Sequence, residues 1–162
     1  MRPTILHCRL PLLATLAVCA LAAFTPCPTA ALGRPLASAA KLVRVDDSAQ
    51  MRLVTKNGTV LKERGEAGGS LELSPILCTF YDINSEHGTA TVTGYVHGSA
   101  LYGRSAITAY TAGDISHFEG AMTITGGTGA YAHASGQRLM FKGTINRHDF
   151  HVSAEIKGTF RQ

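Results

Sequence analysis

The sequence predicts an all-β protein: one eight-stranded antiparallel up-and-down β-barrel, preceded by an N-terminal signal peptide. Three observations support this prediction. Apolar and polar residues alternate along most of the chain after residue 42, which is typical of strands with one buried and one solvated face. Short glycine-rich or polar segments separate the alternating runs. The first 31 residues have the basic start, apolar run and small-residue end of a secretion signal.

Residues 1–31 are predicted to be a secretion signal rather than part of the fold. Two arginines begin the segment, and an apolar run of about 15 residues follows at Leu10–Phe24. That run is shorter than the ~20 residues that a helix needs to span a bilayer. Cleavage after Ala31, or later at Ser38–Ala40, would release the protein. We therefore expect a secreted or extracytoplasmic protein without membrane association after cleavage; a retained anchor is the alternative.

The composition of the remaining chain limits its partners. Without residues 1–31, Cys78 is the one cysteine left, so the domain must be held by its hydrophobic core. Cys78 lies in the apolar run Ile76–Phe80, and we expect its thiol to be buried and inert. Thirteen basic residues remain against 11 acidic ones. No basic stripe suited to phosphates is present, so we expect no nucleic-acid partner, and we expect no cofactor.

Residues 32–41 are rich in Ala, Leu, Ser and Pro and are predicted to form a flexible lead-in to a single domain over residues 42–162. Asn57-Gly58 is a strong hairpin signal. Ser74-Pro75 interrupts the alternation, so we expect a bulge or bend there. Gly65 to Gly69 is expected to be a turn. Alternation and turn signals together predict eight strands, at about 42–56, 59–64, 71–81, 88–97, 101–110, 117–125, 136–146 and 149–160.

The last two predicted strands alternate most clearly. Leu139, Phe141 and Ile145 share one face of the first, and Val152, Ile156 and Phe160 share one face of the second. Glycines at inward positions suit sharply bent barrel strands, and closure into a barrel removes exposed edges. A two-sheet sandwich is the alternative. One group of side chains is expected to face outward unless the register slips by one residue: Tyr95, His97, Tyr102, Arg104 and Tyr110.

One segment resembles the signature of the allene oxide cyclase and dirigent superfamily. In Phe118–Tyr131 a strand ends in Gly126-Gly127-Thr128-Gly129, an aromatic residue follows two positions on, and Ala134–Gln137 contains the small-residue turn. Gly98–Arg104 is similar to the dirigent pattern G-S-x-L…G-R, and Thr79-Phe80-Tyr81 is similar to the strand before it. The resemblance covers about residues 78–160.

The resemblance implies an eight-stranded barrel with an apolar cavity, often secreted and often a homo-oligomer. It also implies an isomerase-like activity, the cyclisation or coupling of a small hydrophobic molecule. Gly126, Gly127, Thr128 and Gly129 are expected to be a structural turn, because glycine permits positive φ in a tight strand exit. The turn opens no helix and lacks the lysine of a phosphate loop.

Polar residues are expected to gather at the barrel ends. Alternate turns of an up-and-down barrel share an end, which brings together the turns at 57–58, 82–87, 111–116 and 147–148. Their polar residues could bind a metal or transfer protons, but the histidine spacing matches no metal motif, and turn chemistry explains them more simply. They are Asp82, Asn84, Glu86, His87, Asp114, His117, Arg147, His148 and Asp149.

At the opposite end, Tyr131 and His133 could orient a ligand, although an aromatic residue after a glycine turn more often fills the barrel end. We predict no metal site. The predicted ligand-binding residues are Asp82, Asn84, His87, His117, Tyr131 and His133.

Two functions fit these observations. The first is an exported barrel that binds a small hydrophobic molecule in an apolar cavity and could steer its cyclisation or coupling, mainly through geometry. The second is a non-enzymatic extracytoplasmic carrier, or an interaction or structural module, with a barrel filled by its own side chains. An eight-stranded barrel is just wide enough for side chains to fill it. The size of the interior cavity separates the two, and whether the protein is an enzyme stays open.

Overall fold

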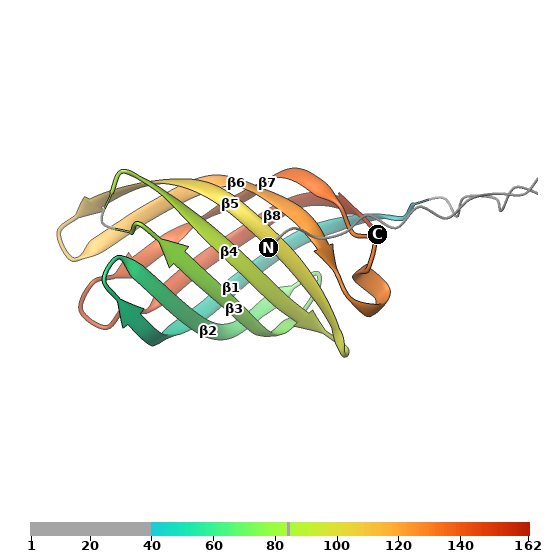
Figure 1. Ribbon diagram of the computed structural model, residues 1–162, viewed down its shortest axis with the longest axis horizontal. Helices are drawn as coiled ribbons and strands as arrows, with labels where there is room; N and C mark the ends of the chain where they lie inside the picture. Colours follow the sequence, from blue (N-terminus) through green and yellow to red (C-terminus); the bar gives the residue numbers. More distant parts are fainter. Residues whose placement is uncertain (1–39, 84) are drawn as a thin grey trace, which may run out of the picture. The chain divides into compact units, whose positions relative to one another are not determined.

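The computed structural model describes residues 40–83 and 85–162, which form a closed antiparallel barrel in which each strand pairs with its neighbours along the chain (Figure 1). The predicted signal peptide and nearly all of the lead-in lie outside the described residues. The elements are β1 (Leu42–Asn57), β2 (Val60–Gly69), β3 (Leu73–Tyr81), β4 (His87–Val96), β5 (Ser99–Ala112), β6 (Ile115–Gly127), the short helix η1 (Gly129–Tyr131), β7 (Gly136–Asn146) and β8 (Val152–Arg161).

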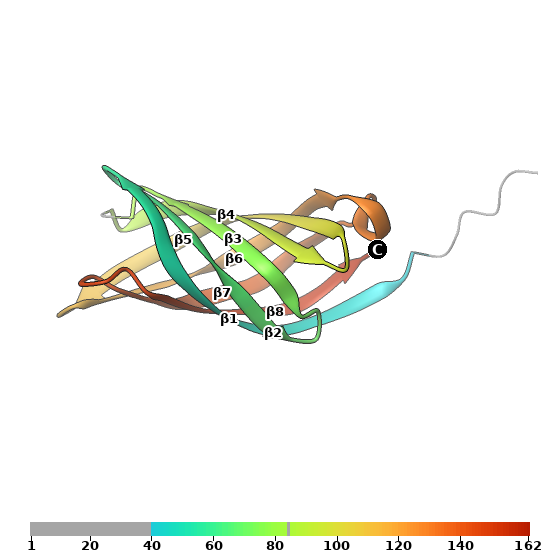
Figure 2. The same ribbon diagram turned by 90° about the horizontal axis from the view of Figure 1, so that it is seen from below.

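The pairing of β1 with β8 closes the barrel. It runs from Leu42 opposite Arg161 to Met51 opposite Val152, so no strand of the barrel is left as an edge. The predicted eight-stranded barrel is confirmed, and the sandwich alternative is wrong. Figures 1 and 2 place the β5–β6 hairpin and the 147–151 turn at one end of the barrel and η1 at the other. In the described part of the chain, no helix is long and apolar enough to cross a bilayer.

The second strand differs from its prediction. The segment Gly65 to Gly69, expected as a turn, is the second half of β2, and it pairs with β1 from Met51 to Asp47. Glycine is needed there because a Cβ on Gly65 would overlap the carbonyl oxygen of Gln50. The expected irregularity beside Ser74-Pro75 is confirmed, since the β2–β3 register shifts between Gly65 and Ala67.

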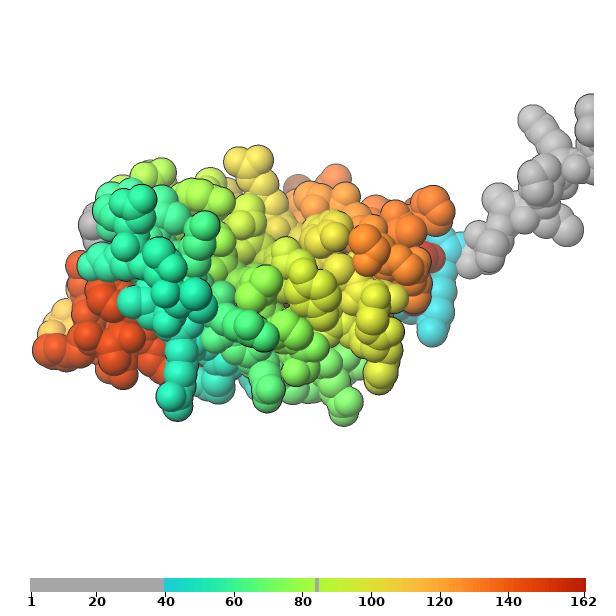
Figure 3. Space-filling model, turned by 60° about the horizontal axis from the view of Figure 1, so that its bottom comes forward, coloured from blue at the N-terminus to red at the C-terminus, as the bar shows by residue number. Residues whose placement is uncertain are grey.

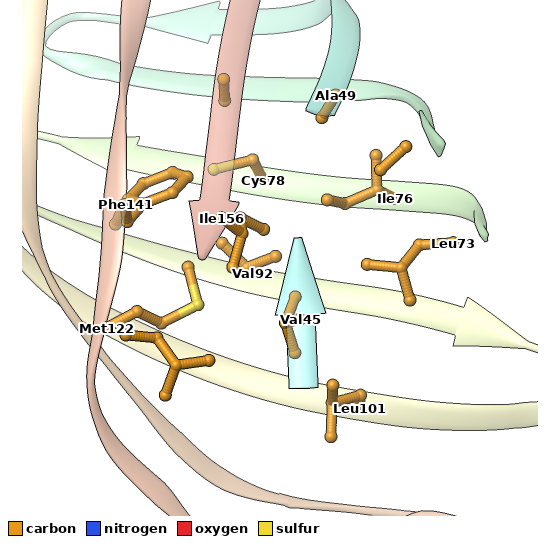
Figure 4. Close-up of a cluster of buried hydrophobic side chains, with 14 of the residues drawn as sticks. Val45, Ala49, Leu73, Ile76, Cys78, Val92, Leu101, Met122, Phe141 and Ile156 are labelled. Carbon is orange, nitrogen blue, oxygen red and sulfur yellow. The ribbon is translucent and has the colours of Figure 1, made fainter. Parts of the chain in front are cut away.

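Inward side chains from all eight strands form one core. Figure 4 shows side chains such as Val92, Met122 and Ile156 converging from different strands, with Cys78 pointing into the same cluster. Three phenylalanine rings pack together in this core. Phe80 and Phe118 meet edge to face, with 5.1 Å between ring centroids. Phe141 lies 5.1 Å from Phe118 and stacks on Phe80 at 6.3 Å.

The faces of the fifth strand follow the predicted register. Tyr102, Arg104 and Tyr110 are exposed, as are Tyr95 and His97 on or beside β4. The slip that would have turned these side chains inward is therefore absent. Glycines at inward positions let neighbouring strands approach closely: a Cβ on Gly143 would overlap the carbonyl oxygen of Ser153.

Replacing Phe141 with alanine should lower the free energy of unfolding by about 3–5 kcal/mol, because the change leaves a cavity among the packed rings. Chemical denaturation followed by circular dichroism measures this loss. The matched control is Tyr102→Ala, which removes an outward ring and should cost less than about 1 kcal/mol. Equal losses in the two variants would contradict the assignment of inner and outer faces.

Candidate functional site

Among the described residues, the cavity inside the barrel is small. A cavity lined by residues such as Val45, Leu73, Leu101 and Leu139 has a volume of about 20 Å³. A site needs roughly 10–15 Å³ of such volume to hold one water molecule, so this space accommodates about one. The side chains around it are apolar and buried. The space inside the barrel is therefore that of a packed core.

One carboxyl group is buried in this core. Glu63 on β2 points inward beside Leu61, its side chain is 2 % exposed, and it lies opposite Cys78 on β3. Both carboxyl oxygens lack a hydrogen-bond partner. Burial raises the pKa of Glu63 to about 7, because the charged form loses its hydration.

The Cys78 thiol is free and buried. Burial raises its pKa far above the usual range, and the neighbouring Glu63 carboxylate raises it further. This confirms that Cys78 is a buried thiol of the core, as its apolar run predicts. The sequence carries a signal for Glu63 as well, because it stands two residues after Leu61 and therefore on the same face of the strand. Charged residues on both sides of Glu63 obscured that signal.

A second buried carboxyl group, Asp47 on β1, has a structural role. Its Oδ1 accepts hydrogen bonds from the Ser70 backbone N–H, the Ser70 hydroxyl at 2.8 Å and the Leu71 backbone N–H at 3.1 Å. These bonds tie the turn between β2 and β3 to β1. Asp47 is therefore occupied in holding the fold.

The predicted ligand-binding residues that the structure describes lie at separate places on the barrel. Asp82 is an exposed turn residue with φ of 56°, and Asn84 lies outside the described residues. His87 and His133 are exposed. Tyr131 is buried, 6.0 Å from Phe160 between ring centroids, which confirms that it fills the barrel end. His117 lies on the outer face of β6, beside Tyr110.

The predicted polar end divides into small local contacts. His148 Nε2 lies 3.1 Å from Asp114 Oδ2, and both side chains are exposed. The Asp149 carboxylate accepts the His151 backbone N–H at 3.0 Å, a turn contact. Among residues 40–83 and 85–162, no group of three or more His, Cys, Asp or Glu side chains is placed to hold a metal ion.

The larger concave space lies outside the barrel wall. Residues of β1, β5, β6, β7 and β8, together with Glu86 before β4, line a groove of about 630 Å³ on the outer side of the wall, called the outer groove below. The groove is open to solvent. Its outward residues alternate along each strand with core residues: on β7, for example, Lys142 and Thr144 lie on the outer face, and Phe141 and Ile145 point into the core. The lining residues are Ser48, Gln50, Glu86, Thr108, Ala109, Tyr110, His117, Phe118, Glu119, Lys142, Gly143, Thr144, Ser153, Ala154 and Glu155.

Cross-strand pairing arranges the outer groove in two rows. The register pairs an outward residue on each strand with an outward residue on the neighbouring strand. These pairs form two continuous rows of side chains across β1, β8, β7, β6 and β5. One row is Gln50, Ser153, Thr144, His117 and Tyr110, and the other is Ser48, Glu155, Lys142, Glu119 and Thr108. A neighbouring hollow of about 420 Å³ shares three of these residues and extends the depression towards His87.

The chemistry of the outer groove changes along its length. At one end the Ser153 hydroxyl donates to the Gln50 side-chain oxygen at 2.8 Å. In the middle Lys142 Nζ lies 3.6 Å from the Glu155 carboxylate. At the far end Tyr110 stacks on His117, with 4.8 Å between ring centroids and 12° between ring planes. The outer groove therefore combines hydroxyl and amide groups, charges and an aromatic platform.

Figure 3 shows a different face of the barrel, on which β2, β3 and β4 lie between the segment around η1 at one end and the 147–151 turn at the other. Exposed apolar side chains on this side include Leu77, Tyr81 and Tyr95. Thr91 stands at the middle of β4, half-buried and outward, opposite Thr79 and Arg104. This face supplies matched control positions for the outer groove.

The pH dependence of stability tests the state of Glu63. Below pH 4.5, its ordinary pKa, the carboxyl group is protonated in both the folded and the unfolded chain. Between there and about 7 the unfolded chain ionises while the folded chain keeps the proton, so stability falls as the pH rises and then levels off. In Glu63→Gln this pH-dependent loss should be smaller by roughly 1–3 kcal/mol in the free energy of unfolding, as measured by chemical denaturation across the pH range.

The control for this measurement is Glu66→Gln, which neutralises an exposed carboxylate on the same strand. It should leave the pH profile of stability unchanged. A Glu63→Gln profile parallel to that of the wild type would show that Glu63 is solvated in the folded protein.

Comparisons with known proteins found no match: no protein-family model, no curated protein and no solved structure matches this chain. The resemblance to allene oxide cyclases and dirigent proteins therefore stays a prediction from the chain's own motifs.

Proposed function

We propose that this protein is a non-enzymatic, secreted binding module whose core stabilises the barrel and whose outer groove holds the partner. One observation carries the proposal: the cavity inside the barrel measures about 20 Å³, whereas the outer groove measures about 630 Å³. Ligand sites in proteins usually measure ~300–1,000 Å³ and include a few placed polar groups. The outer groove falls within this volume range and, unlike the interior cavity, is lined by polar side chains together with Tyr110 and His117.

The competing proposal places a small hydrophobic ligand inside the barrel. Such a ligand would have to displace several core side chains, including rings such as Phe80 and Phe141, which are 1 % exposed or less. Removing those contacts costs several kcal/mol, because protein interiors are packed as densely as organic crystals. The polar groove needs no such displacement.

The groove residues are also held in place. Apart from Glu86, which immediately precedes β4, each stands on a strand that is hydrogen-bonded to neighbours on both sides within a closed barrel. Sites built on strands keep their geometry better than sites built on loops, and less conformational entropy is lost on binding. A preformed polar surface of this kind suits recognition of a partner rather than enclosure of a reacting molecule.

Native mass spectrometry of the protein purified from its own host tests the filled interior. We expect the mass of the mature chain with nothing bound and no fluorescence increase from the apolar probe 1-anilinonaphthalene-8-sulfonate, because about 20 Å³ admits neither ligand nor probe. A retained apolar molecule would favour the cavity-binding function.

A variant that fills the outer groove tests its role in binding. Thr144 is half-buried at the centre of the groove, so Thr144→Trp should block it without entering the core. The matched control, Thr91→Trp, adds the same ring at a half-buried outward position on β4. We expect the wild type and Thr91→Trp to co-sediment with washed host cells, and Thr144→Trp to bind at least about tenfold more weakly. Equal sedimentation of all three, or none by the wild type, would contradict the proposal.

A further inference from the structure

We propose that the ligand of the outer groove is an amine-bearing saccharide, such as a chain of glucosamine units. This inference rests on the proposed function, since it assigns a ligand class to the same groove. Three features of the groove carry it: an exposed aromatic platform, an excess of carboxylates and a row of hydroxyl and amide groups.

The aromatic platform lies at the β5–β6 end. Tyr110 is 66 % exposed, although large aromatic rings are usually buried more deeply. His117 stacks on one face of its ring in near-parallel orientation, which leaves the other face open to a ligand. A tyrosine ring offers an apolar face together with a polar edge. The C–H face of a sugar ring pairs with such a surface, and a bound cation is also attracted to it.

The charge of the groove favours a cation. Its lining contains three glutamates and one lysine, a formal net charge of −2. The lysine, Lys142, is already 3.6 Å from Glu155, which Lys157 also approaches at 3.4 Å. The carboxylates of Glu86 and Glu119 form no ion pair or side-chain hydrogen bond with another described residue. An ammonium group beside the Tyr110 ring could bind these carboxylates through charge-assisted hydrogen bonds.

The rest of the groove matches a polyol. Ser48, Thr108, Thr144, Ser153 and Gln50 each carry groups that donate and accept hydrogen bonds, as sugar hydroxyls do. Five adjacent strands at ~4.8 Å spacing give the row a length of roughly 19 Å, enough for a short oligosaccharide. An apolar ligand could not use the hydrogen-bonding capacity of these groups, and an anionic one would meet the carboxylates. An amine-bearing sugar satisfies all three features at once.

Isothermal titration calorimetry of the full chain with the β-1,4 glucosamine tetramer tests the ligand class. The measurement is made at mildly acidic pH, where the sugar amine is protonated. We expect this tetramer to bind at least about tenfold more tightly than the N-acetylglucosamine tetramer, and a galacturonate tetramer not to bind. Affinity should fall as the salt concentration rises, because the carboxylates are exposed.

Variants locate the site. Tyr110→Ala and Glu119→Gln should each weaken binding of the glucosamine tetramer at least about tenfold. Tyr102→Ala, an exposed tyrosine of the same strand outside the lining of the groove, should bind as the wild type does. Circular dichroism of each variant shows whether the barrel is intact.

The outcomes separate the ligand class from the proposed function. Absence of tetramer binding, or equal affinity for the acetylated or acidic tetramer, overturns the amine-bearing saccharide. If Thr144→Trp still abolishes sedimentation with host cells in that case, the groove keeps its binding role with another ligand. Tetramer binding that survives Tyr110→Ala, Glu119→Gln and Thr144→Trp overturns both proposals.

Discussion

The pairing of β1 with β8 is the constraint on which the rest of the structure depends. Ten residue pairs join the first and last strands, and the sheet then has no edge and encloses a single interior. Each strand is thereby divided into inward and outward positions, and the two sets have different roles. Because the pairing joins residues about 100 positions apart, closure also costs more chain entropy than any of the hairpins.

Closure fixes the size of the interior, and the inward side chains fit that size. Neighbouring strands approach so closely at Gly143 that a methyl group would overlap the Ser153 carbonyl oxygen, while Phe80, Phe118 and Phe141 fill the space between opposite walls. Glu63 is the exception, a carboxyl group without a partner in this core. Burial keeps this carboxyl protonated in the folded chain while it ionises in the unfolded chain, so stability falls as the pH rises towards 7, and the remainder of the core must offset that cost.

Because the interior is filled, the side chains that can contact a ligand are those on the outer face of the barrel wall. The same hydrogen bonds that hold the core in register set the outward side chains in rows, so residues far apart in the sequence, such as Gln50 and Ser153, meet at 2.8 Å. Tyr110 and His117 stack for the same reason, because they face each other across β5 and β6. The rigidity of the barrel thus becomes the preorganisation of its outer surface.

The sequence by itself determined the strands and their faces. Alternation placed Phe141, Ile145 and Val152 inside and Tyr102 and Tyr110 outside, because a strand repeats every two residues whatever it packs against. Local patterns predicted a turn at Gly65 to Gly69, where the structure has a strand. Glycine favours turns, and here it is needed in a strand because the neighbouring backbone leaves no room for a side chain. Three features were decided by the tertiary structure alone: the outer groove, the absence of a hydrogen-bond partner for the buried Glu63 carboxyl group, and the filled interior. Each depends on which strands become neighbours and how tightly the barrel closes, and the pairing of β1 with β8 joins positions too distant for any local pattern to specify.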